Sequence, residues 1–283
     1  MRPTLVEVFG LKFHAYPTML ALAFLVGTLL TVRHGERAKP PIIGNPQGGL
    51  WAFIGALVGA KVFWILQYSE AKLLWRAFFL WEGGLVYYGG LIGGALAAFA
   101  YITVHKLPIR RSADVCAIYL ALGQVITRVG CFLNGCCWGI ETDVPWALTF
   151  PKNSYAYKHQ IEAGIIDHTA LHANPVHPTQ LYMVIGLIAI FALLKVAYGR
   201  RHFDGAIALL YCFAYGILRF IVEFYRGDSA RSVFGMTVSQ VISLGILIFP
   251  VVVLAVMRSG VLGSKGLDND GEAPAEESEA APD

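Results

Sequence analysis

Seven long apolar stretches dominate this chain and leave little room for any fold other than a bundle of membrane helices. Each stretch is about 20 residues long, which is the length that an α-helix needs to cross the hydrocarbon core of a bilayer. Charged residues make up 14% of the chain, whereas a soluble domain carries about 25%. The sequence therefore predicts an all-α, polytopic membrane protein with about seven transmembrane helices, near residues 16–32, 49–67, 85–104, 113–131, 180–198, 205–225 and 236–257.

The loops between these stretches predict the orientation and the outlying segments. The short loops after the first, third and fifth stretches, and the segment after the last, are the more basic set. Because short basic loops stay in the cytoplasm, we expect the N-terminus outside and the C-terminus inside. Residues 1–262 then form the membrane domain, and 132–179 form a small head on its outer face. Residues 263–283 are acidic and poor in apolar side chains, so we expect a disordered cytoplasmic tail.

Charged side chains near the outer ends of the spans are the first functional signal. Arg219 and Glu223 are four residues apart and so share one helix face. Arg128 and Arg226 lie near the same depth, and a charge inside a bilayer costs from roughly 2.5 kcal/mol upwards unless it is partnered. The surplus of positive charge favours an anionic ligand, and a lipid phosphate is the most available one. Two simpler interpretations remain open: Arg128 could extend to the interface, and the Arg219–Glu223 pair could only fix helix packing.

The segment RVGCFLNGCCWG, residues 128–139, combines one of these arginines with three cysteines. Asn134 supplies an amide, and Gly139 allows the backbone to approach a ligand. The spacing of Cys131, Cys136 and Cys137 matches no common zinc motif, so neither a metal nor another cofactor is expected. A disulfide on the outer side and simple packing of small side chains both remain possible roles for the cysteines.

Glycine pairs and a histidine mark two further segments. Gly93 and Gly94, in the third stretch, indicate close helix packing. The pairs Gly83–Gly84 and Gly89–Gly90 suggest irregular backbone that lines protein or a cavity. His177 precedes a span in HPTQLY, with a proline suited to the first helical turn. A histidine at this position could titrate near neutrality, although such residues more often form a hydrogen bond or a cap.

Several of these motifs, in this order, resemble the bacterial phosphatidylglycerol–prolipoprotein diacylglyceryl transferases. The resemblance covers about residues 10–258 and rests on FHAYPTMLALAFLVG, EGGLVYYGGLIGG, TRVGCFLNGCCWG, HPTQLY and YGILRFIVEFYRGD. It implies an enzyme of the bacterial cytoplasmic (inner) membrane that moves the diacylglyceryl group of phosphatidylglycerol to the lipobox cysteine of a preprolipoprotein signal peptide. Glycerol phosphate would leave. The expected partners are these two substrates and membrane lipid; we expect a monomer that does not bind nucleic acid.

The resemblance also implies roles for individual residues. Arg128 and Arg219 would stabilise charge on the phosphate as it leaves, and Glu223 would hold an arginine in place. The residues expected to bind substrate are Tyr16, Asn134, Gly139, Cys131, Arg226 and His177.

The chain departs from the family pattern at three positions. Tyr88 stands where much of the family has a histidine, and a tyrosine with a pKa near 10 is a poor base, so Tyr88 is expected to orient or relay a proton. Cys131 and Cys136 replace an asparagine and a glutamate of the pattern. The alternatives are therefore a membrane thiol-redox or metal protein built on the cysteines, and a phospholipid-binding module without turnover.

Overall fold

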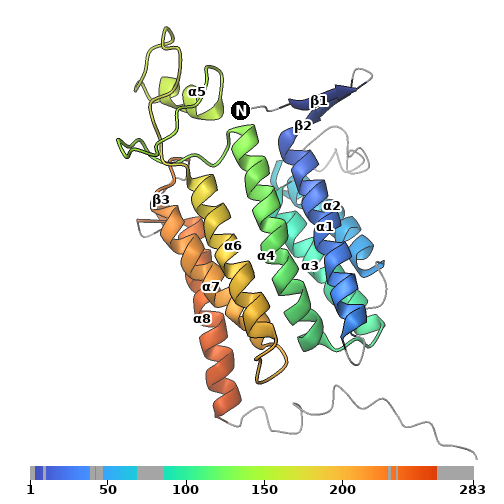
Figure 1. The fold of residues 1–283 in the computed structure, drawn as a ribbon. Helices are drawn as coiled ribbons and strands as arrows, with labels where there is room; N and C mark the ends of the chain where they lie inside the picture. The colour runs from blue at the N-terminus through green and yellow to red at the C-terminus, as the bar shows by residue number, and fades with distance from the viewer. Residues whose placement is uncertain are drawn as a thin grey trace, which may run out of the picture.

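Seven long helices run side by side in the computed structural model (Figure 1). The structure describes residues 4–8, 11–38, 42, 47–68, 86–228, 231–233 and 235–259. Six of the helices are long and apolar enough to cross a membrane, and one further helix has the shorter apolar stretch Gly89–Val104. The predicted polytopic all-α fold is confirmed, because each expected span overlaps one of these helices: α1 (Ala15–Arg37), α2 (Gln47–Tyr68), α3 (Tyr87–Val104), α4 (Ile109–Asn134), α6 (Thr179–Tyr198), α7 (Ala206–Glu223) and α8 (Val238–Arg258).

Helix α4 lies at the centre of the bundle (Figure 1). It packs against α1 on one side and against α6 and α7 on the other, while α8 packs against α7. The largest buried cluster lies where α4 meets α6 and α7, and it includes Ile118, Leu194 and Ile207. Many large apolar side chains on the outer faces of the helices are exposed. That distribution is expected when lipid rather than water covers the outside of the bundle.

Helices α2 and α3 cross at very short range through glycine. A Cβ added at Gly59 would clash with the carbonyl oxygen of Gly89, and one added at Gly93 would clash with that of Gly55. The predicted packing role of Gly93 is therefore confirmed. The expectation of irregular backbone at Gly89 and Gly90 is wrong, because both lie inside α3 and the absent side chains serve helix contact. Gly83 and Gly84 lie outside the described residues.

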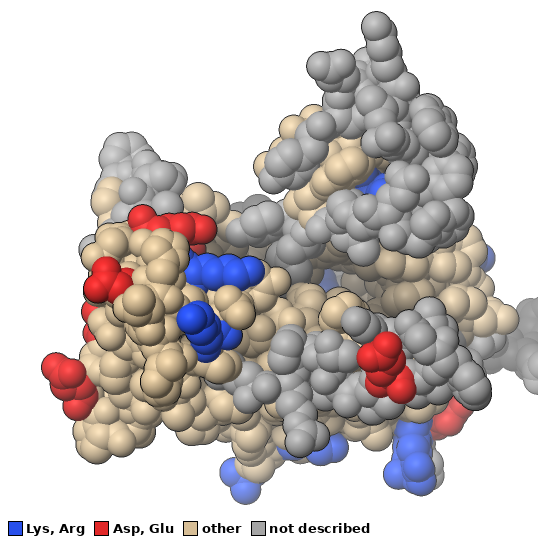
Figure 2. Space-filling view, turned by 90° about the horizontal axis from the view of Figure 1, so that it is seen from above, with Lys and Arg blue, Asp and Glu red and all other residues tan. Residues whose placement is uncertain are grey.

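A small head lies at one end of the bundle, on the side of α6 and α7 (Figure 1). It contains the short helix α5 (Tyr155–Glu162) and a core formed by Phe150, Ala156, Tyr157, Ala173 and Val176. Figure 2 shows charged side chains of both signs gathered over this head. This unit lies within residues 132–179, of which the first three belong to α4, since that helix runs to Asn134. Two hairpins accompany it, β1 (Thr4–Val8) with β2 (Leu11–His14), and β3 (Arg231–Val233) with β4 (Met236–Thr237). The expected tail, 263–283, lies outside the described residues.

At the opposite end of the bundle, a buried carboxylate joins α4 to the start of α7. The side chain of Asp114, in α4, accepts hydrogen bonds of 2.9 Å from the backbone N–H groups of Gly205, Ile207 and Ala208. These groups begin α7 and have no partner within their own helix. Asp114 therefore caps α7 from a different helix. It supplies the negative charge that the N-terminal end of a helix dipole favours.

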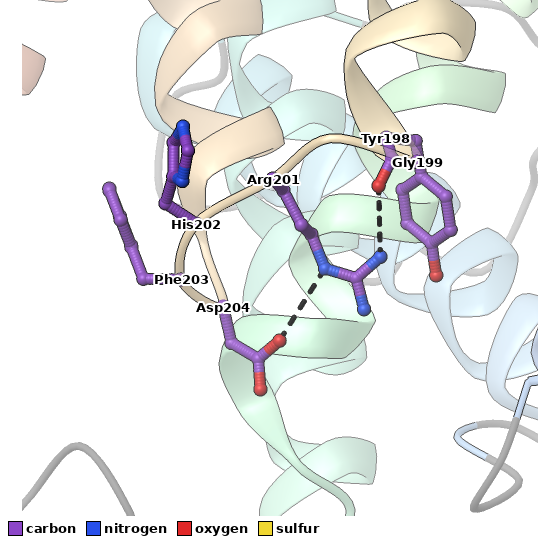
Figure 3. Close-up of a pocket in the computed structure, with 6 residues that line it drawn as sticks. All are labelled: Tyr198, Gly199, Arg201, His202, Phe203 and Asp204. Carbon is purple, nitrogen blue, oxygen red and sulfur yellow. Dashed lines mark hydrogen bonds and ion pairs between the residues drawn. The ribbon is translucent and has the colours of Figure 1, made fainter.

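A shallow pocket lies beside this cap, in the loop between α6 and α7 (Figure 3). The guanidinium of Arg201 donates to the carbonyl oxygen of Tyr198 and lies 3.5 Å from a carboxylate oxygen of Asp204. This arginine is already neutralised, so the pocket offers no strong anion site. It lies at the end of the bundle remote from the head and is lined by Tyr198, Gly199, Arg201, His202, Phe203 and Asp204.

Candidate active site

A chain of charged side chains crosses the head-side end of α7. The Nη1 atom of Arg219 lies 2.6 Å from the Oε2 atom of Glu223, and the Nη1 atom of Arg226 lies 3.6 Å from the same oxygen. Arg226 also donates two hydrogen bonds of 2.8 Å to Asp228. The Glu223 side chain is buried, with 3% of the residue exposed. The ion pair predicted from the spacing of Arg219 and Glu223 is confirmed.

The start of α8 holds this pair from the other side. Thr237 donates a hydrogen bond of 2.8 Å to the Oε1 atom of Glu223, and Arg219 donates one of 2.9 Å to Ser239. Thr237 is also the N-cap of α8 and forms a capping box with Gln240. Neither contact is predicted from the sequence. The pattern Thr-x-x-Gln before an apolar run does signal a helix start, but it does not reveal which carboxylate shares the threonine hydroxyl.

Three segments distant in the sequence meet at Gly139. Its N–H donates to the carbonyl oxygen of His177, and the N–H of Ile140 donates to that of Tyr225. Gly139 also pairs with Arg226 in an antiparallel bridge. A Cβ at position 139 would lie 2.5 Å from atoms of His177. Gly139 thus joins the head, the start of α6 and the end of α7 through backbone hydrogen bonds.

Arg128 lies at the head-side end of α4, near the same charges. It interacts electrostatically with Cys137, Cys131 and Arg226, and also with Arg219. Among the described residues, no carboxylate lies within 4 Å of its guanidinium. The structure therefore brings the three predicted arginines into one electrostatic neighbourhood, with Glu223 between two of them and Asp228 at its edge. The positive charge exceeds what Glu223 neutralises, and this arrangement suits a phosphate.

Gly135 ends α4 and turns the chain back on itself. Its φ of 75° is left-handed, a conformation that glycine adopts without steric cost. The N–H of Cys136 then donates to the carbonyl oxygen of Cys131, as in a Schellman ending. The turn brings the Sγ atoms of Cys131, Cys136 and Cys137 within 4.8 Å of one another. All three are free thiols, so the disulfide that the sequence left open is not formed.

The polar start of α6 holds the two cysteines that follow the turn. Thr179 donates a hydrogen bond of 2.6 Å to the carbonyl oxygen of Cys137, and Gln180 donates one of 2.8 Å to that of Cys136. Hydrogen bonds from the neighbouring thiols of Cys131 and Cys136, together with the charge of the nearby arginines, lower the pKa of the Cys137 thiol, although burial opposes this shift.

The side chain of His177 belongs to an aromatic group above this turn. Its Nδ1 atom lies 2.9 Å from the hydroxyl of Tyr182, which also accepts a hydrogen bond from the indole of Trp146. The ring packs edge-on against Tyr225. Burial lowers the pKa of His177, which favours the neutral ring. The predicted hydrogen-bonding role is confirmed, and the cap of α6 is Pro178.

Fewer contacts define the positions of the other predicted site residues, Tyr16, Asn134 and Tyr88. Tyr16, at the start of α1, lies against α4, since a Cβ at Gly130 would be 3.6 Å from the Tyr16 Cα. Asn134 is the last residue of α4 and interacts with the Cys136 thiol. Tyr88 lies in the first turn of α3, and its side chain falls outside the described part of the chain. Tyr16 and Asn134 are thus near the cysteine turn, while a role for Tyr88 stays a prediction.

Comparison with known proteins identifies the family. The profile of the family described as prolipoprotein diacylglyceryl transferase matches residues 3–256. The chain is 33% identical over 254 residues to phosphatidylglycerol–prolipoprotein diacylglyceryl transferase 2 of Clostridium perfringens, covering 88% of this chain and 92% of that one. It is 31% identical over 263 residues to the transferase of Clostridium tetani, covering 91% and 98%. These matches extend from the first hairpin to the last helix, so this chain belongs to the prolipoprotein diacylglyceryl transferase family.

Proposed function

We propose that this chain transfers the diacylglyceryl group of phosphatidylglycerol to the lipobox cysteine of a preprolipoprotein. The observation that carries the proposal is the group of Arg128, Arg219 and Arg226 at one end of a membrane bundle, with Glu223 held between Arg219 and Arg226. Phosphatidylglycerol carries one phosphate at the depth of the lipid head groups. The substrate names of the related transferases agree with this assignment.

The chemistry requires a nucleophile and a leaving group. The sulfur of the lipobox cysteine attacks the glyceryl carbon that bears the phosphate ester, and a carbon–sulfur bond forms as the carbon–oxygen bond breaks. The bonding electrons leave with glycerol phosphate, and the thiol proton is lost before or during the attack. Negative charge therefore grows on the phosphate as the reaction proceeds. Fixed guanidinium groups in a site shielded from water stabilise that charge more than the ground state.

Each arginine has a distinct part in this proposal. Arg128 has no carboxylate partner among the described residues, so its guanidinium is the one most available to the phosphate. Arg219 is oriented by Glu223 and Ser239 and would stabilise the charge on the leaving group. Arg226 binds Asp228 through two nitrogens, which leaves it a supporting role. Tyr16 and Asn134 would line the head-group site. Gly139 would shape it through the backbone, and Tyr88 would orient the thiol or relay its proton.

We further propose that the head and the arginines face the outside of a bacterial cytoplasmic membrane. The basic loops favour this orientation, and it places the site where an exported signal peptide arrives. Residues 1–262 would form the catalytic membrane domain, with 263–283 a cytoplasmic tail. The single bundle holds all the proposed site residues, so a monomer suffices, and nucleic acid has no role in the reaction.

Product analysis tests the proposal. The purified protein is incubated with phosphatidylglycerol and a lipobox peptide, and mass spectrometry detects a diacylglyceryl thioether on the peptide cysteine. A peptide with serine in place of that cysteine should give no product. Lipid binding without any thioether, under conditions in which the Clostridium tetani relative is active, would instead favour a phospholipid-binding module.

Substitution of the arginines tests the site. Arg128→Ala and Arg219→Ala should each lower turnover about 100-fold or more, since loss of one donor to a developing anion costs that much in other enzymes. Arg258→Ala, at the last residue of α8 and remote from the head, should leave turnover unchanged. Wild-type turnover in both site variants would contradict the proposed role of the two arginines in stabilising the phosphate.

A further inference from the structure

The three thiols at the end of α4 lie close together, and no step of the proposed reaction involves them. Their Sγ atoms lie within 4.8 Å of one another, and no disulfide joins them. Three thiolates bound to one zinc ion lie about 4 Å apart, because the Zn–S bond is about 2.3 Å. The observed cluster therefore needs only small side-chain adjustments to surround such an ion.

The backbone around the cluster is held in place. The carbonyl groups of Cys136 and Cys137 accept hydrogen bonds from Gln180 and Thr179, and both of those side chains belong to buried residues. Cys137 has a φ of 61°, a left-handed conformation that is uncommon for a residue other than glycine. These contacts fix the direction of the two cysteines, so the convergence of the thiols is built into the turn.

The charge beside the cluster suits a thiolate complex. Arg128 and Arg226 both interact electrostatically with Cys137. Three thiolates around a divalent ion carry a net charge of −1, and the positive charge of the nearby guanidinium groups favours such a complex. Among the described residues, no histidine or carboxylate completes the cluster. A zinc site with three protein ligands keeps its fourth position for water or substrate.

We propose that Cys131, Cys136 and Cys137 bind a thiophilic divalent ion such as Zn²⁺, and that its fourth position takes the cysteine thiol of the lipoprotein substrate. The second half of this proposal rests on the function proposed above. A water molecule leaves the metal, the substrate thiol loses its proton to solvent, and its sulfur becomes a metal-bound thiolate. That sulfur then attacks the glyceryl carbon of phosphatidylglycerol. The carbon–oxygen electron pair departs with glycerol phosphate, and the thioether product leaves the metal.

Metal analysis of the unaltered protein is the first test. Protein purified in detergent without chelators should retain about one zinc ion per chain, and X-ray absorption should show about three sulfur ligands at the usual zinc–sulfur distance. A variant with serine at 131, 136 and 137 should lose the metal, while Cys116→Ser with Cys212→Ser should keep it. Absence of metal binding in protein supplied with zinc, or a disulfide within the cluster of active enzyme, would overturn the proposal.

The fourth ligand is tested without turnover. In protein loaded with Co²⁺, the lipobox peptide should strengthen the sulfur-to-metal charge-transfer absorption, and the serine form of the peptide should not. An unchanged spectrum with the cysteine peptide would overturn the thiol step.

Activity separates this proposal from the function on which it rests. Removal of zinc by a chelator should abolish thioether formation, and added zinc should restore it. Full activity in metal-free protein would overturn the metal site and leave the transferase standing. A metal-loaded protein that binds the peptide thiol but forms no product would overturn the transferase and leave the metal site standing.

Discussion

Gly139 shows how one absent side chain allows three segments to meet. Its N–H donates to His177, and a Cβ would lie 2.5 Å from the carbonyl oxygen of His177 and 2.7 Å from that of Tyr225. Both obstacles belong to backbone that is itself hydrogen-bonded, so neither can move without breaking the junction. The glycine that the sequence assigned to a ligand pocket is therefore required first by the fold.

Gly139→Ala should consequently destabilise the protein by about 1–3 kcal/mol, the usual cost of overpacking, and should lower activity as the site distorts. Thermal unfolding in detergent, followed with a thiol-reactive dye, would measure the change. Gly199→Ala is the matched control because no atom lies within 4 Å of the added Cβ. Equal stability of the two variants would contradict the proposed junction.

Titration of the His177 side chain makes the stability of the folded protein depend on pH. Burial lowers its pKa, so in mildly acidic solution the unfolded chain binds a proton that the folded chain does not. Stability supplied by the neutral ring is thus present above the ordinary histidine value of about 6.5 and is lost as the pH falls below it.

His177→Asn should flatten this part of the pH profile. We expect the melting temperature of the wild-type protein to fall more steeply than that of the variant between about pH 7 and pH 5. His202→Asn, at an exposed histidine in the loop between α6 and α7, should keep the wild-type slope. The same slope in all three proteins would show that His177 does not titrate as proposed.

At the scale of elements, the N-terminus of α8 links helix capping to the candidate site. Thr237 accepts a hydrogen bond from the N–H of Gln240 and donates its own proton to Glu223. A single hydroxyl therefore begins a helix and satisfies a buried carboxylate. Loss of the cap alone costs about 1 kcal/mol, and a buried carboxylate without its donor adds to that cost.

Thr237→Val removes the hydroxyl while keeping the shape of the side chain. We expect a loss of stability of about 1–3 kcal/mol and a fall in turnover larger than any change in peptide affinity, because Glu223 no longer holds Arg219 firmly. Kinetics at varied peptide concentration would separate the two effects. Thr103→Val is a control of identical chemistry, since that hydroxyl is exposed and bonds only to its own helix. Unaltered turnover in Thr237→Val would show that the network does not position Arg219.

The helices were more predictable than their contacts, for a physical reason. Apolar length determines where a membrane helix lies, and it located all seven. The i, i+4 rule likewise predicted the Arg219–Glu223 pair. The partners Thr237 and Ser239 come from another helix, and periodicity within one helix carries no information about them. The crossing of α2 and α3 does have a local sequence signal, since Gly55 and Gly59 are four residues apart.

For the whole molecule, the distribution of basic loops predicts the orientation in the membrane. Alkaline phosphatase inserted at Gly164, an exposed position in the head, should be active because that enzyme needs an oxidising exterior to form its disulfides. The same reporter fused after Asp283 should be inactive, whereas green fluorescent protein fused there should fluoresce. The reverse pattern would contradict the orientation and move the site to the cytoplasm.

The contact between α7 and α8 has a consequence for biosynthesis. A chain emerges from the ribosome N-terminus first, so Arg219 and Glu223 enter the membrane before Thr237 and Ser239 do. Until the last helix is inserted, the charged pair lacks the two hydroxyl groups that hold it. A nascent chain that ends before α8 would therefore carry an incomplete site. The site would therefore become complete only when the final helix is inserted, near the end of biosynthesis.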